Sequence, residues 1–335
     1  MKNLVIGVAG TAKNTGKTTT LMTMINLLKE VKPCTIGLTG IGYDGENFDN
    51  VTGLPKPRID VYEGMIVASA DRCVNAAKAE IEILARTDIR TGLGRIVIGC
   101  VKSPGKIVVA GPVKGSDLRI TLDIMTDFGA RLVFVDGALG RVAPFTEADG
   151  LILATGASRN SDINSLALET KNLLSILGCP AKEEKGVVSR FGSVLTEDSF
   201  DSFLKTFINA DTLVVEGLLS GRFLNDIVGN KALYGKRLLF GNPYKLLLAG
   251  ETNDVFAALE KIKINIEIGV RKPVNVIAVT VNPYYPKYRY STKDYEEAFV
   301  DKDALLCAIK KSSTAPCYNA AVNPDELLKE IMNKL

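Results

Sequence analysis

The sequence predicts an α/β protein with a doubly wound, mostly parallel sheet, and three observations support this fold class. Short runs rich in Val, Ile and Leu recur along the chain, as expected for parallel strands that are buried on both faces. Segments of helical length separate these runs, which is the pattern of repeated strand–helix–strand units. The chain has 335 residues, of which 46% are hydrophobic, so it can form two domains or one extended sheet with a sizeable core.

The first half of the chain alternates regularly between the two kinds of segment. We expect its strands at Leu4–Ala9, Cys34–Leu38, Arg95–Val101, Ile107–Ala110, Leu132–Val135 and Leu151–Ala154. We expect its helices at Lys17–Glu30, Asp71–Ala85, Ser116–Phe128 and Asp162–Leu177. The last helix is followed by Gly178 and Pro180, two residue types that end helices.

The second half resumes the alternation after a charged stretch at residues 182–185. Its strands are expected at Thr212–Val215, Arg237–Phe240, Lys245–Leu248, Val274–Val281 and Ala315–Tyr318, and its helices at Asn253–Ile262 and Asp301–Lys311. We therefore expect a boundary near residues 180–190, with one domain at 1–180 and a C-terminal α/β half, a candidate partner-binding domain, at 187–335. The pattern leaves open whether this half extends the first sheet or forms a second domain.

Composition excludes several classes of function. The chain contains no histidine, so it has no His general base, no Ser-His-Asp or Cys-His nucleophile system and no His-ligated metal. Its 6 cysteines are scattered without a Cys-x-x-Cys pair, so they predict neither a zinc ribbon nor a redox motif. The 41 Lys and Arg residues exceed the 38 Asp and Glu residues by only +3, too slight a bias to predict a nucleic-acid partner.

The hydrophobic segments predict neither secretion nor membrane insertion. The N-terminal apolar run at Leu4–Ala9 is too short for a signal peptide. No stretch approaches the ~20 apolar residues of a transmembrane helix. We therefore expect a soluble, cytoplasmic protein that does not act on a membrane.

The strongest functional signal is the segment that follows the first expected strand. It reads Gly-Thr-Ala-Lys-Asn-Thr-Gly-Lys-Thr-Thr over residues 10–19, and a helix-forming run comes next. Polyphosphate is bound by backbone N–H groups at a helix N-terminus, with a lysine for the β- and γ-phosphates and a hydroxyl for Mg²⁺. Lys17 and Thr18 would supply the lysine and the hydroxyl. We name residues 10–19 the phosphate-loop candidate, and we expect ATP and Mg²⁺ as its ligands.

The phosphate-loop candidate departs from the usual Gly-x-x-x-x-Gly-Lys-[Ser/Thr] pattern at one position. That pattern places a glycine five residues before Gly16, where this chain has Thr11, and Gly10 lies one residue earlier. We therefore expect a first turn that differs slightly from the usual one. The residues expected at the nucleotide are Gly10, Thr11, Ala12, Lys13, Asn14, Thr15, Gly16, Lys17, Thr18 and Thr19.

A magnesium ion at the phosphates needs an acidic residue at the end of a neighbouring strand. The apolar run Leu132–Val135 ends in Asp136, and a glycine follows that lets the chain turn near the phosphates. We predict Asp136 as the Walker B acid and as a ligand of Mg²⁺. The alternative is that Asp136 caps a helix, a common use of aspartate at the end of a strand.

The segment Thr39–Glu63 is rich in Gly, Asp, Asn and Pro, and it is longer than structural loops usually are, which favours a functional loop. Within it, Asp44 and Glu46 are flanked by glycines. We expect Asp44 to orient Mg²⁺ or the attacking water, and Glu46 to sense the γ-phosphate or a partner. An ordinary surface excursion is the alternative for this segment.

Two weaker signals lie in the second half. Glu216 follows an apolar run and precedes a glycine, and Asn282–Pro286 forms a rigid, aromatic turn after another run. Either could face a partner or complete a cleft, although turn chemistry alone explains both. The dipeptide Asn230-Lys231 lacks the aspartate of the guanine-recognition signature, so adenine is favoured over guanine.

The loop Gly10–Thr18, with Lys13 inside it, resembles the SIMIBI class of P-loop NTPases, whose members include the molybdopterin-guanine-dinucleotide accessory protein and dethiobiotin synthetase. The resemblance implies a P-loop NTPase type of sheet and a homodimer with sites at or near its interface. Lys13 lies four residues before Lys17, whereas the lysine that acts across the dimer in the ParA-like branch lies five before. Lys13 is thus a candidate catalytic residue that also fits a solvated loop position.

Within that class, four segments together resemble the KamB-like P-loop subunits of lysine 5,6-aminomutase reactivases. They are the loop at 12–18, Tyr-Asp-Gly-Glu at 43–46, Val-Asp-Gly-Ala at 135–138 and Glu-Gly-Leu-Leu-Ser-Gly-Arg-Phe at 216–223. The resemblance implies an ATP-dependent reactivating factor that works with a MutS-like ATPase subunit. Its client would be an adenosylcobalamin- and pyridoxal-phosphate-dependent aminomutase that has lost its adenosyl group.

Two other functions stay open at this point. One is an ATP-dependent biosynthetic enzyme of the dethiobiotin-synthetase or cobyrinate-amidating type, which activates a small carboxylate. Its substrate pocket would use polar residues at 114–119, which also fit the start of a capped helix: Lys114, Ser116, Asp117 and Arg119. The other is a nucleotide-binding scaffold that does not hydrolyse ATP.

Overall fold

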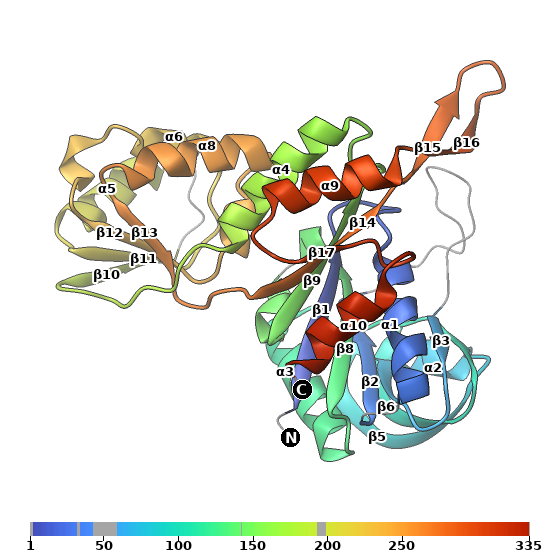
Figure 1. Cartoon of the computed structure of the whole chain (residues 1–335). Helices are drawn as coiled ribbons and strands as arrows, with labels where there is room; N and C mark the ends of the chain where they lie inside the picture. The colour runs from blue at the N-terminus through green and yellow to red at the C-terminus, as the bar shows by residue number, and fades with distance from the viewer. Residues whose placement is uncertain (1–2, 32–33, 43–58, 142, 193–198, 335) are drawn as a thin grey trace. The chain divides into compact units, whose positions relative to one another are not determined.

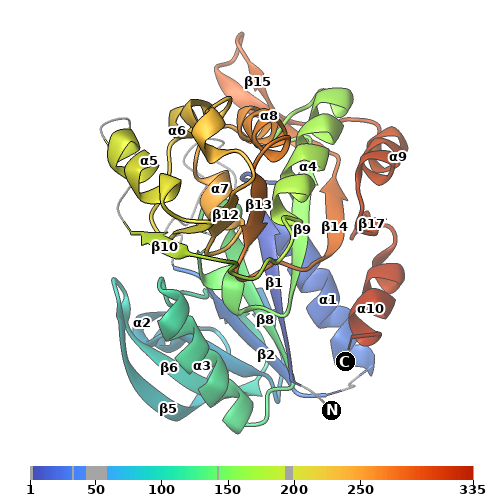
Figure 2. The same ribbon diagram turned by 90° about the vertical axis from the view of Figure 1, so that its left-hand side faces the viewer.

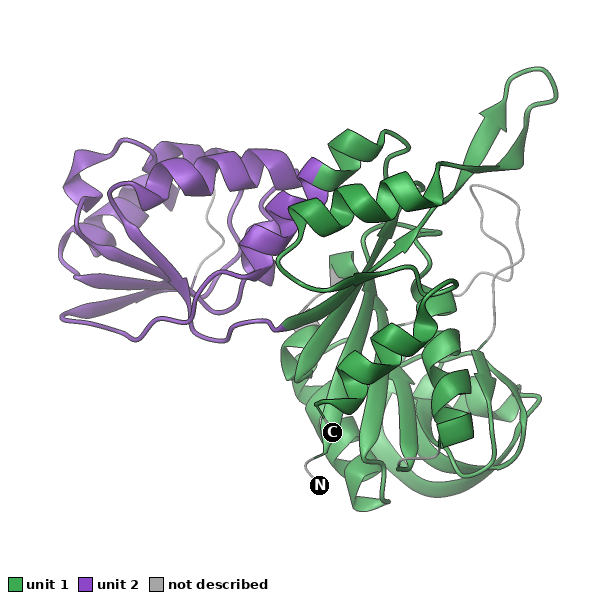
Figure 3. Ribbon diagram, viewed as in Figure 1, with its two compact units in different colours: residues 1–167, 276–335 green, residues 168–275 purple. Residues whose placement is uncertain are grey.

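The computed structural model describes residues 3–31, 34–42, 59–141, 143–192 and 199–334 (Figure 1). The described residues divide into two compact units (Figure 3). Unit 1 contains residues 1–167 and 276–335, and unit 2 contains residues 168–275. The helix α4 (Ile163–Leu177) begins in unit 1 and ends in unit 2.

In the described part of unit 1, nine strands form one sheet, in the order β17-β14-β9-β1-β8-β2-β4-β6-β5. The pairs from β17 to β4 are parallel, and β6 pairs antiparallel with both β4 and β5. The central strands β1 and β9 are buried along their whole length, as the continuous apolar runs predict. The strands are β1 Leu4–Gly10, β2 Ile36–Gly40, β4 Ile66–Ala70, β5 Glu80–Thr91, β6 Gly94–Ser103, β8 Leu132–Ala138, β9 Gly150–Gly156, β14 Val276–Asn282 and β17 Cys317–Tyr318.

Helices cover both faces of this sheet. Figure 2 shows α1 (Lys17–Val31) and α10 (Pro324–Met332) on one side and α3 (Gly115–Asp127) on the other. Apart from Thr20, the buried residues of α1 are apolar, and they recur with the helical period: Leu21, Met24, Ile25 and Leu28. The remaining helical segments are α2 Asp71–Asn75, α9 Lys302–Ser312, and the 3₁₀ turns η1 Leu139–Arg141 and η2 Ala143–Glu147.

Two short antiparallel pairs complete the described part of unit 1. The strands β3 (Ile59–Val61) and β7 (Gly105–Ile107) pair with each other. The strands β15 (Tyr284–Arg289) and β16 (Asp294–Phe299) form a hairpin that continues from β14 and projects away from the sheet (Figure 1).

The described part of unit 2 is built on a smaller, fully parallel sheet of four strands in chain order, β10-β11-β12-β13. Helices lie along one face of it (Figure 1), and five phenylalanines in its core pack edge to face or stacked: Phe191, Phe200, Phe203, Phe207 and Phe223. The elements are β10 Val188–Phe191, α5 Phe200–Ile208, β11 Thr212–Val215, α6 Gly221–Ile227, η4 Lys231–Leu233, β12 Arg237–Phe240, α7 Tyr244–Leu247, α8 Thr252–Lys263 and β13 Glu267–Val270.

The α/β class and the large, mostly parallel sheet are confirmed, but three expected elements are wrong. The helix expected at Asp71–Ala85 ends at Asn75, and residues 80–91 form β5. The alternation of Glu and Ile at 80–83 has the period of a strand, and these residues pair antiparallel with β6. The strand expected at Lys245–Leu248 is the helix α7, and Pro243 at its N-cap already lies in the right-handed helical region, with a ψ of −18° beside the φ of −69° that its ring fixes. The strand expected at Ile107–Ala110 ends at Ile107 as β7.

The two units differ from the expected division at 1–180 and 187–335. Unit 2 is an insertion, because the chain returns to the first sheet at β14, where Thr280 pairs with Ala154 of β9. The C-terminal half therefore does both of the things that the sequence left open. Residues 168–275 form a second unit with its own sheet, and β14 and β17 extend the first sheet. Within the described ranges, no helix has the length and apolarity needed to span a membrane.

Candidate functional site

The phosphate-loop candidate has the backbone geometry of a tight strand-to-helix turn. It leaves β1 at Gly10 and enters α1 at Lys17. Asn14 and Gly16 have positive φ values of 61° and 86°, so the loop passes twice through the left-handed region. A Cβ on Gly10 would lie 3.0 Å from Oγ1 of Thr15, which shows how closely the first turn packs. Gly10 thus allows the backbone of the first turn to pack closely against Thr15, although the usual pattern has its glycine one residue later.

Hydrogen bonds join the loop to strand β9 and connect residues within the loop. Thr11 donates its backbone N–H to the carbonyl of Ala154 at 2.9 Å, and its hydroxyl lies 3.2 Å from that of Thr155. The buried Thr15 donates its hydroxyl to the carbonyl of Ala12 at 2.9 Å. Two of these bonds use threonine hydroxyls, and the third uses the backbone N–H of Thr11. The first backbone N–H groups of a helix such as α1 point out of its N-terminal end.

Asn282, at the end of β14, also holds the loop. Its Nδ2 donates to the carbonyl of Asn14 at 2.9 Å, and a Cβ on Gly16 would lie 3.0 Å from the Cβ of Asn282. Ser158 reaches the same region, with its hydroxyl 2.9 Å from the carbonyl of Tyr284 and 3.3 Å from that of Asn14. One hydroxyl hydrogen serves one acceptor at a time, so the shorter bond to Tyr284 is favoured. Asn282 and Ser158 therefore contact both the loop, at Asn14, and the base of the hairpin, at Tyr284.

Lys17 and Asp136 lie together at the carboxyl ends of the central strands. Asp136 pairs in register with Val8 of β1, and Lys17 opens the helix that follows β1. The Nζ of Lys17 is 2.9 Å from Oδ1 of Asp136, and both side chains are largely buried, with exposures of 24% and 20%. Although it has this ion-pair partner, Oδ1 is buried without a hydrogen bond of acceptable angle. This carboxylate can therefore accept a further ligand.

The three threonines at the start of α1 differ in their surroundings. Thr18 is half-buried and Thr19 is exposed. Thr20 is buried, and its hydroxyl is 2.9 Å from that of Thr280 on β14, which ties α1 to that strand. Lys13 is exposed on the loop, where it has an interaction of its own.

The donor set fits a magnesium ion that is bound together with phosphates. Such an ion takes one or two carboxylates, a hydroxyl, phosphate oxygens and water. Asp136 and Thr18 are the residues that would hold it. No group of three His, Cys, Asp or Glu side chains with metal-binding spacing occurs among the residues that the structure describes, so this fit depends on the phosphates.

Asp44 and Glu46 lie outside the described residues. The chain that leads to them is anchored beside Asp136, because Ile41 donates its N–H to the Asp136 carbonyl at 2.8 Å. Gly42 exchanges backbone hydrogen bonds with Gly111 and Pro112 at 3.0 and 3.1 Å.

The residues considered for a small-acid pocket do not point to one. Lys114 and Ser116 are exposed where α3 begins, and no side chain caps that helix start. The guanidinium of Arg119 forms an ion pair with Glu147, with its Nη2 2.7 Å from Oε2. This arrangement favours a structural role for the start of α3.

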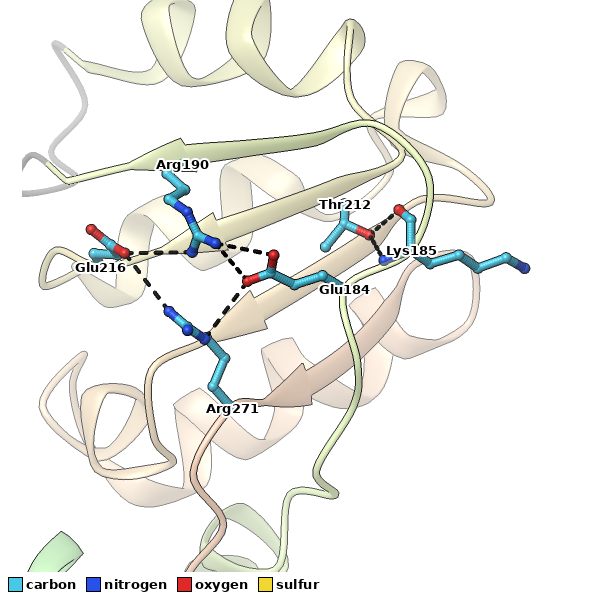
Figure 4. Close-up of polar contacts among 6 residues, drawn as sticks. All are labelled: Glu184, Lys185, Arg190, Thr212, Glu216 and Arg271. Carbon is cyan, nitrogen blue, oxygen red and sulfur yellow. Dashed lines mark hydrogen bonds and ion pairs between the residues drawn. The ribbon is translucent and has the colours of Figure 1, made fainter.

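Glu216 belongs to a network of charges in unit 2 (Figure 4). Arg190 on β10 binds both carboxylate oxygens of Glu184, at 2.8 and 3.0 Å. Arg190 and Arg271 each lie within 4 Å of both Glu184 and Glu216. Lys245 donates to the backbone carbonyl of Glu216, and burial lowers the pKa of Lys245 while the Glu216 charge opposes that shift. Each of the two carboxylates lies within ion-pair distance of both guanidinium groups, and the partner-facing role expected for Glu216 stays a prediction.

The turn expected at Asn282–Pro286 is wrong, because Asn282 ends β14, Tyr284 already opens β15, and only Pro283 separates the two strands. The segment leads into the hairpin of β15 and β16. One hairpin face carries Tyr288, Tyr290 and Tyr295 in edge-to-face contact, with Tyr290 87% exposed. The other face carries charges, among which Arg289 binds Asp294 and lowers the pKa of that carboxyl to about 2.

Comparison of the chain with protein-family models, with curated proteins and with solved structures found no match in any of the three. The site therefore rests on its own geometry. Sequence reasoning named the loop and Asp136, whereas it did not identify the supports from β9 and Ser158. Asn282 was recognised only as a turn residue, because its bond to Asn14 spans 268 positions in the chain.

Proposed function

We propose that this protein is a Mg²⁺-dependent ATPase of the P-loop NTPase type. The observation that carries the proposal is the meeting of Lys17 and Asp136 at 2.9 Å, beside a tight loop that ends at a helix N-terminus. A cation, a carboxylate and outward backbone N–H groups at one sheet edge are what a bound polyphosphate requires. The absence of the guanine-recognition aspartate after Asn230-Lys231 favours ATP as the nucleotide.

Each residue of the site has a defined part in this proposal. Phosphoryl transfer depends mostly on positioning and on electrostatic stabilisation of the phosphate oxygens. Lys17 binds the β- and γ-phosphates, and the backbone of residues 11–16 encloses them. Thr18 and Asp136 hold Mg²⁺, which neutralises charge that develops on the phosphates. Asn282 keeps the loop in the shape that receives them.

We further propose that the ATPase serves as a cytoplasmic reactivating factor for an adenosylcobalamin-dependent aminomutase. The support is the resemblance of the loop, the Asp136 strand end and residues 216–223 to the P-loop subunits of lysine 5,6-aminomutase reactivases. The chain lacks histidine, so it cannot bind cobalamin through a His ligand of its own, and in this proposal the cobalamin enzyme is a separate partner. ATP binding and hydrolysis would bias a two-state element that acts on the client.

Phosphate release from MgATP and MgGTP tests this function. The protein should turn over MgATP slowly when alone and faster with a MutS-like ATPase subunit and inactivated aminomutase, and it should prefer ATP to GTP. Turnover that is indifferent to both proteins would refute the reactivase role while leaving the ATPase intact. Absence of nucleotide binding would refute the whole proposal.

A further inference from the structure

Helix α3 carries an apolar stripe on the side that faces solvent. Its core-facing side chains include Leu118 and Leu122, which are buried. Ile120 lies two positions from each of them and therefore points the other way, with 48% of it exposed. Ile124 and Phe128 follow at intervals of four along the same side, and Phe128 is 42% exposed. We name Ile120, Ile124 and Phe128 the α3 stripe, because aligned apolar residues on a surface helix indicate a docking face more than scattered ones do.

The charges beside the α3 stripe run from positive at the start of the helix to negative at its end. Lys114 is exposed at the N-cap of α3. Asp123 and Asp127 are exposed further along, and neither has an ion-pair partner among the described residues. Arg119, on the same helix, forms its ion pair with Glu147 and so leaves these aspartates uncompensated. A partner of the stripe therefore needs an acid opposite the helix start and cations opposite its end.

Helix α9 presents a shallow hollow with the reverse order of charges. The α9 hollow is lined by Asp303, Leu306, Cys307, Lys310 and Lys311. Its acid lies in the first turn of α9 and its two lysines in the last turn. In the part of the chain that the structure describes, these lysines also have no ion-pair partner. The half-buried leucine and the exposed cysteine form an apolar middle between the charges.

The two surfaces lie toward opposite ends of the large sheet of unit 1. Helix α9 packs on β14 and β17, which stand at one end of the strand order, whereas α3 packs on β4 and β6 toward the other end (Figure 2). The α3 stripe therefore does not reach the α9 hollow of its own chain. A contact between them joins two copies, and each copy then keeps one surface of each kind for a further neighbour.

The two surfaces match when the helices run in the same direction. If Asp123 lies beside Lys310, the common rise of 1.5 Å per residue places Ile120 over the apolar middle of the hollow. In the same alignment Lys114 falls within one turn of Asp303. Opposite charges therefore meet at both ends of the contact, with apolar side chains between them. The reverse direction would instead place Lys114 beside the hollow's lysines.

We propose that the α3 stripe of one copy docks on the α9 hollow of a second copy, so that the protein self-associates head to tail. A contact between two helix faces is small, so the association is weak and depends on concentration. A head-to-tail contact builds rings or open chains and does not stop at a dimer. Neither helix belongs to the phosphate-loop candidate, so this inference goes beyond the proposed function and stands apart from it.

Sedimentation velocity of the whole chain over a series of concentrations tests the contact. The solution contains no nucleotide, and it contains a reductant because the exposed Cys307 would otherwise be able to link copies by a disulfide. Ile120→Lys places a cation on the α3 stripe, and Lys310→Glu places an acid opposite Asp123. Lys329→Glu is the control, because it makes the same charge change as Lys310→Glu at an exposed position of α10. Thermal melting verifies that all four proteins are folded.

The wild type and Lys329→Glu should form species larger than a dimer as the concentration rises. Ile120→Lys and Lys310→Glu should each associate at least about tenfold more weakly, because like charges placed together at an interface are strongly unfavourable. An equimolar mixture of these two variants should regain wild-type affinity but stop at a dimer, since one variant keeps its α9 hollow and the other keeps its α3 stripe.

A wild type that stays monomeric at every concentration would overturn the proposal and would leave both surfaces to partners other than this chain. Wild-type association that ends at a dimer would overturn it as well, because a head-to-tail contact leaves free surfaces. A mixture that associates no better than the separate variants would also refute the pairing of the α3 stripe with the α9 hollow.

Discussion

Replacing Asn282 with alanine should destabilise the phosphate-loop candidate, although Asn282 lies 268 positions after Asn14 in the chain. The variant loses the 2.9 Å bond from Nδ2 to the carbonyl of Asn14, worth about 1 kcal/mol. Asn14 has a φ of 61°, a left-handed conformation that asparagine tolerates better than most residues, and the bond helps to hold it there. We expect the loop to be destabilised by about 1–2 kcal/mol, which is a factor of roughly 5–30 in MgATP affinity.

The measurement is calorimetric titration with MgAMP-PNP together with thermal melting. Asn172→Ala is the matched control, because Asn172 in unit 2 is buried and donates its Nδ2 to Oδ1 of Asn253 at the same 2.9 Å. The control should lose comparable stability while it keeps wild-type nucleotide affinity. Equal affinities of Asn282→Ala and the wild type would show that the Asn14 carbonyl needs no support from β14, and the reasoning would fail.

Three further predictions concern the loop and unit 2. Lys17→Ala should abolish tight MgATP binding because the phosphates lose their cation; unchanged affinity in the same titration would remove the phosphate-loop assignment. Gly16→Ala should lower the melting temperature more than Gly64→Ala, since both have φ near 86–87° but only the Gly16 Cβ would meet a side chain, at 3.0 Å. The pKa of Glu267 is lowered from 4.5, mainly by its hydrogen bond with Lys182 and next by its hydrogen bond with Arg237. Its stabilisation is complete above pH 4.5 and is lost as the pH falls through the folded pKa, so wild-type and Glu267→Gln melting temperatures should converge in acid; a constant difference down to pH 3 would contradict this.

Chemistry that is local in the chain could be predicted from the sequence. A continuous apolar run, a turn with glycines and a helix-forming run specify β1, the loop and α1 through interactions within about 30 residues. The apolar run that ends in Asp136 specifies β8 in the same way, and parallel strands bring their carboxyl ends to one edge. The proximity of Lys17 and Asp136 is therefore a consequence that sequence reasoning could reach.

Segments with ambiguous periodicity needed their tertiary partners. Residues 80–91 contain good helix formers, but pairing with β6 makes them a strand whose glutamates face outward. The leucines at 246–248 have the composition of a strand, yet residues 244–247 form the helix α7. Pairing with β6 decides β5, whereas α7 is set by backbone hydrogen bonds that Leu246 and Leu247 donate to the Pro243 carbonyl.

The α/β class, the phosphate-loop candidate and the acidic strand end could all be predicted from the order of residues in the chain. That unit 2 is an insertion, and that β14 returns to lie beside β9, emerges from the folded structure. That return places Asn282 against Asn14 and the hairpin base against the loop. Strand order depends on the summed burial and pairing of distant segments, whereas a turn or a helix start depends on a few neighbouring residues.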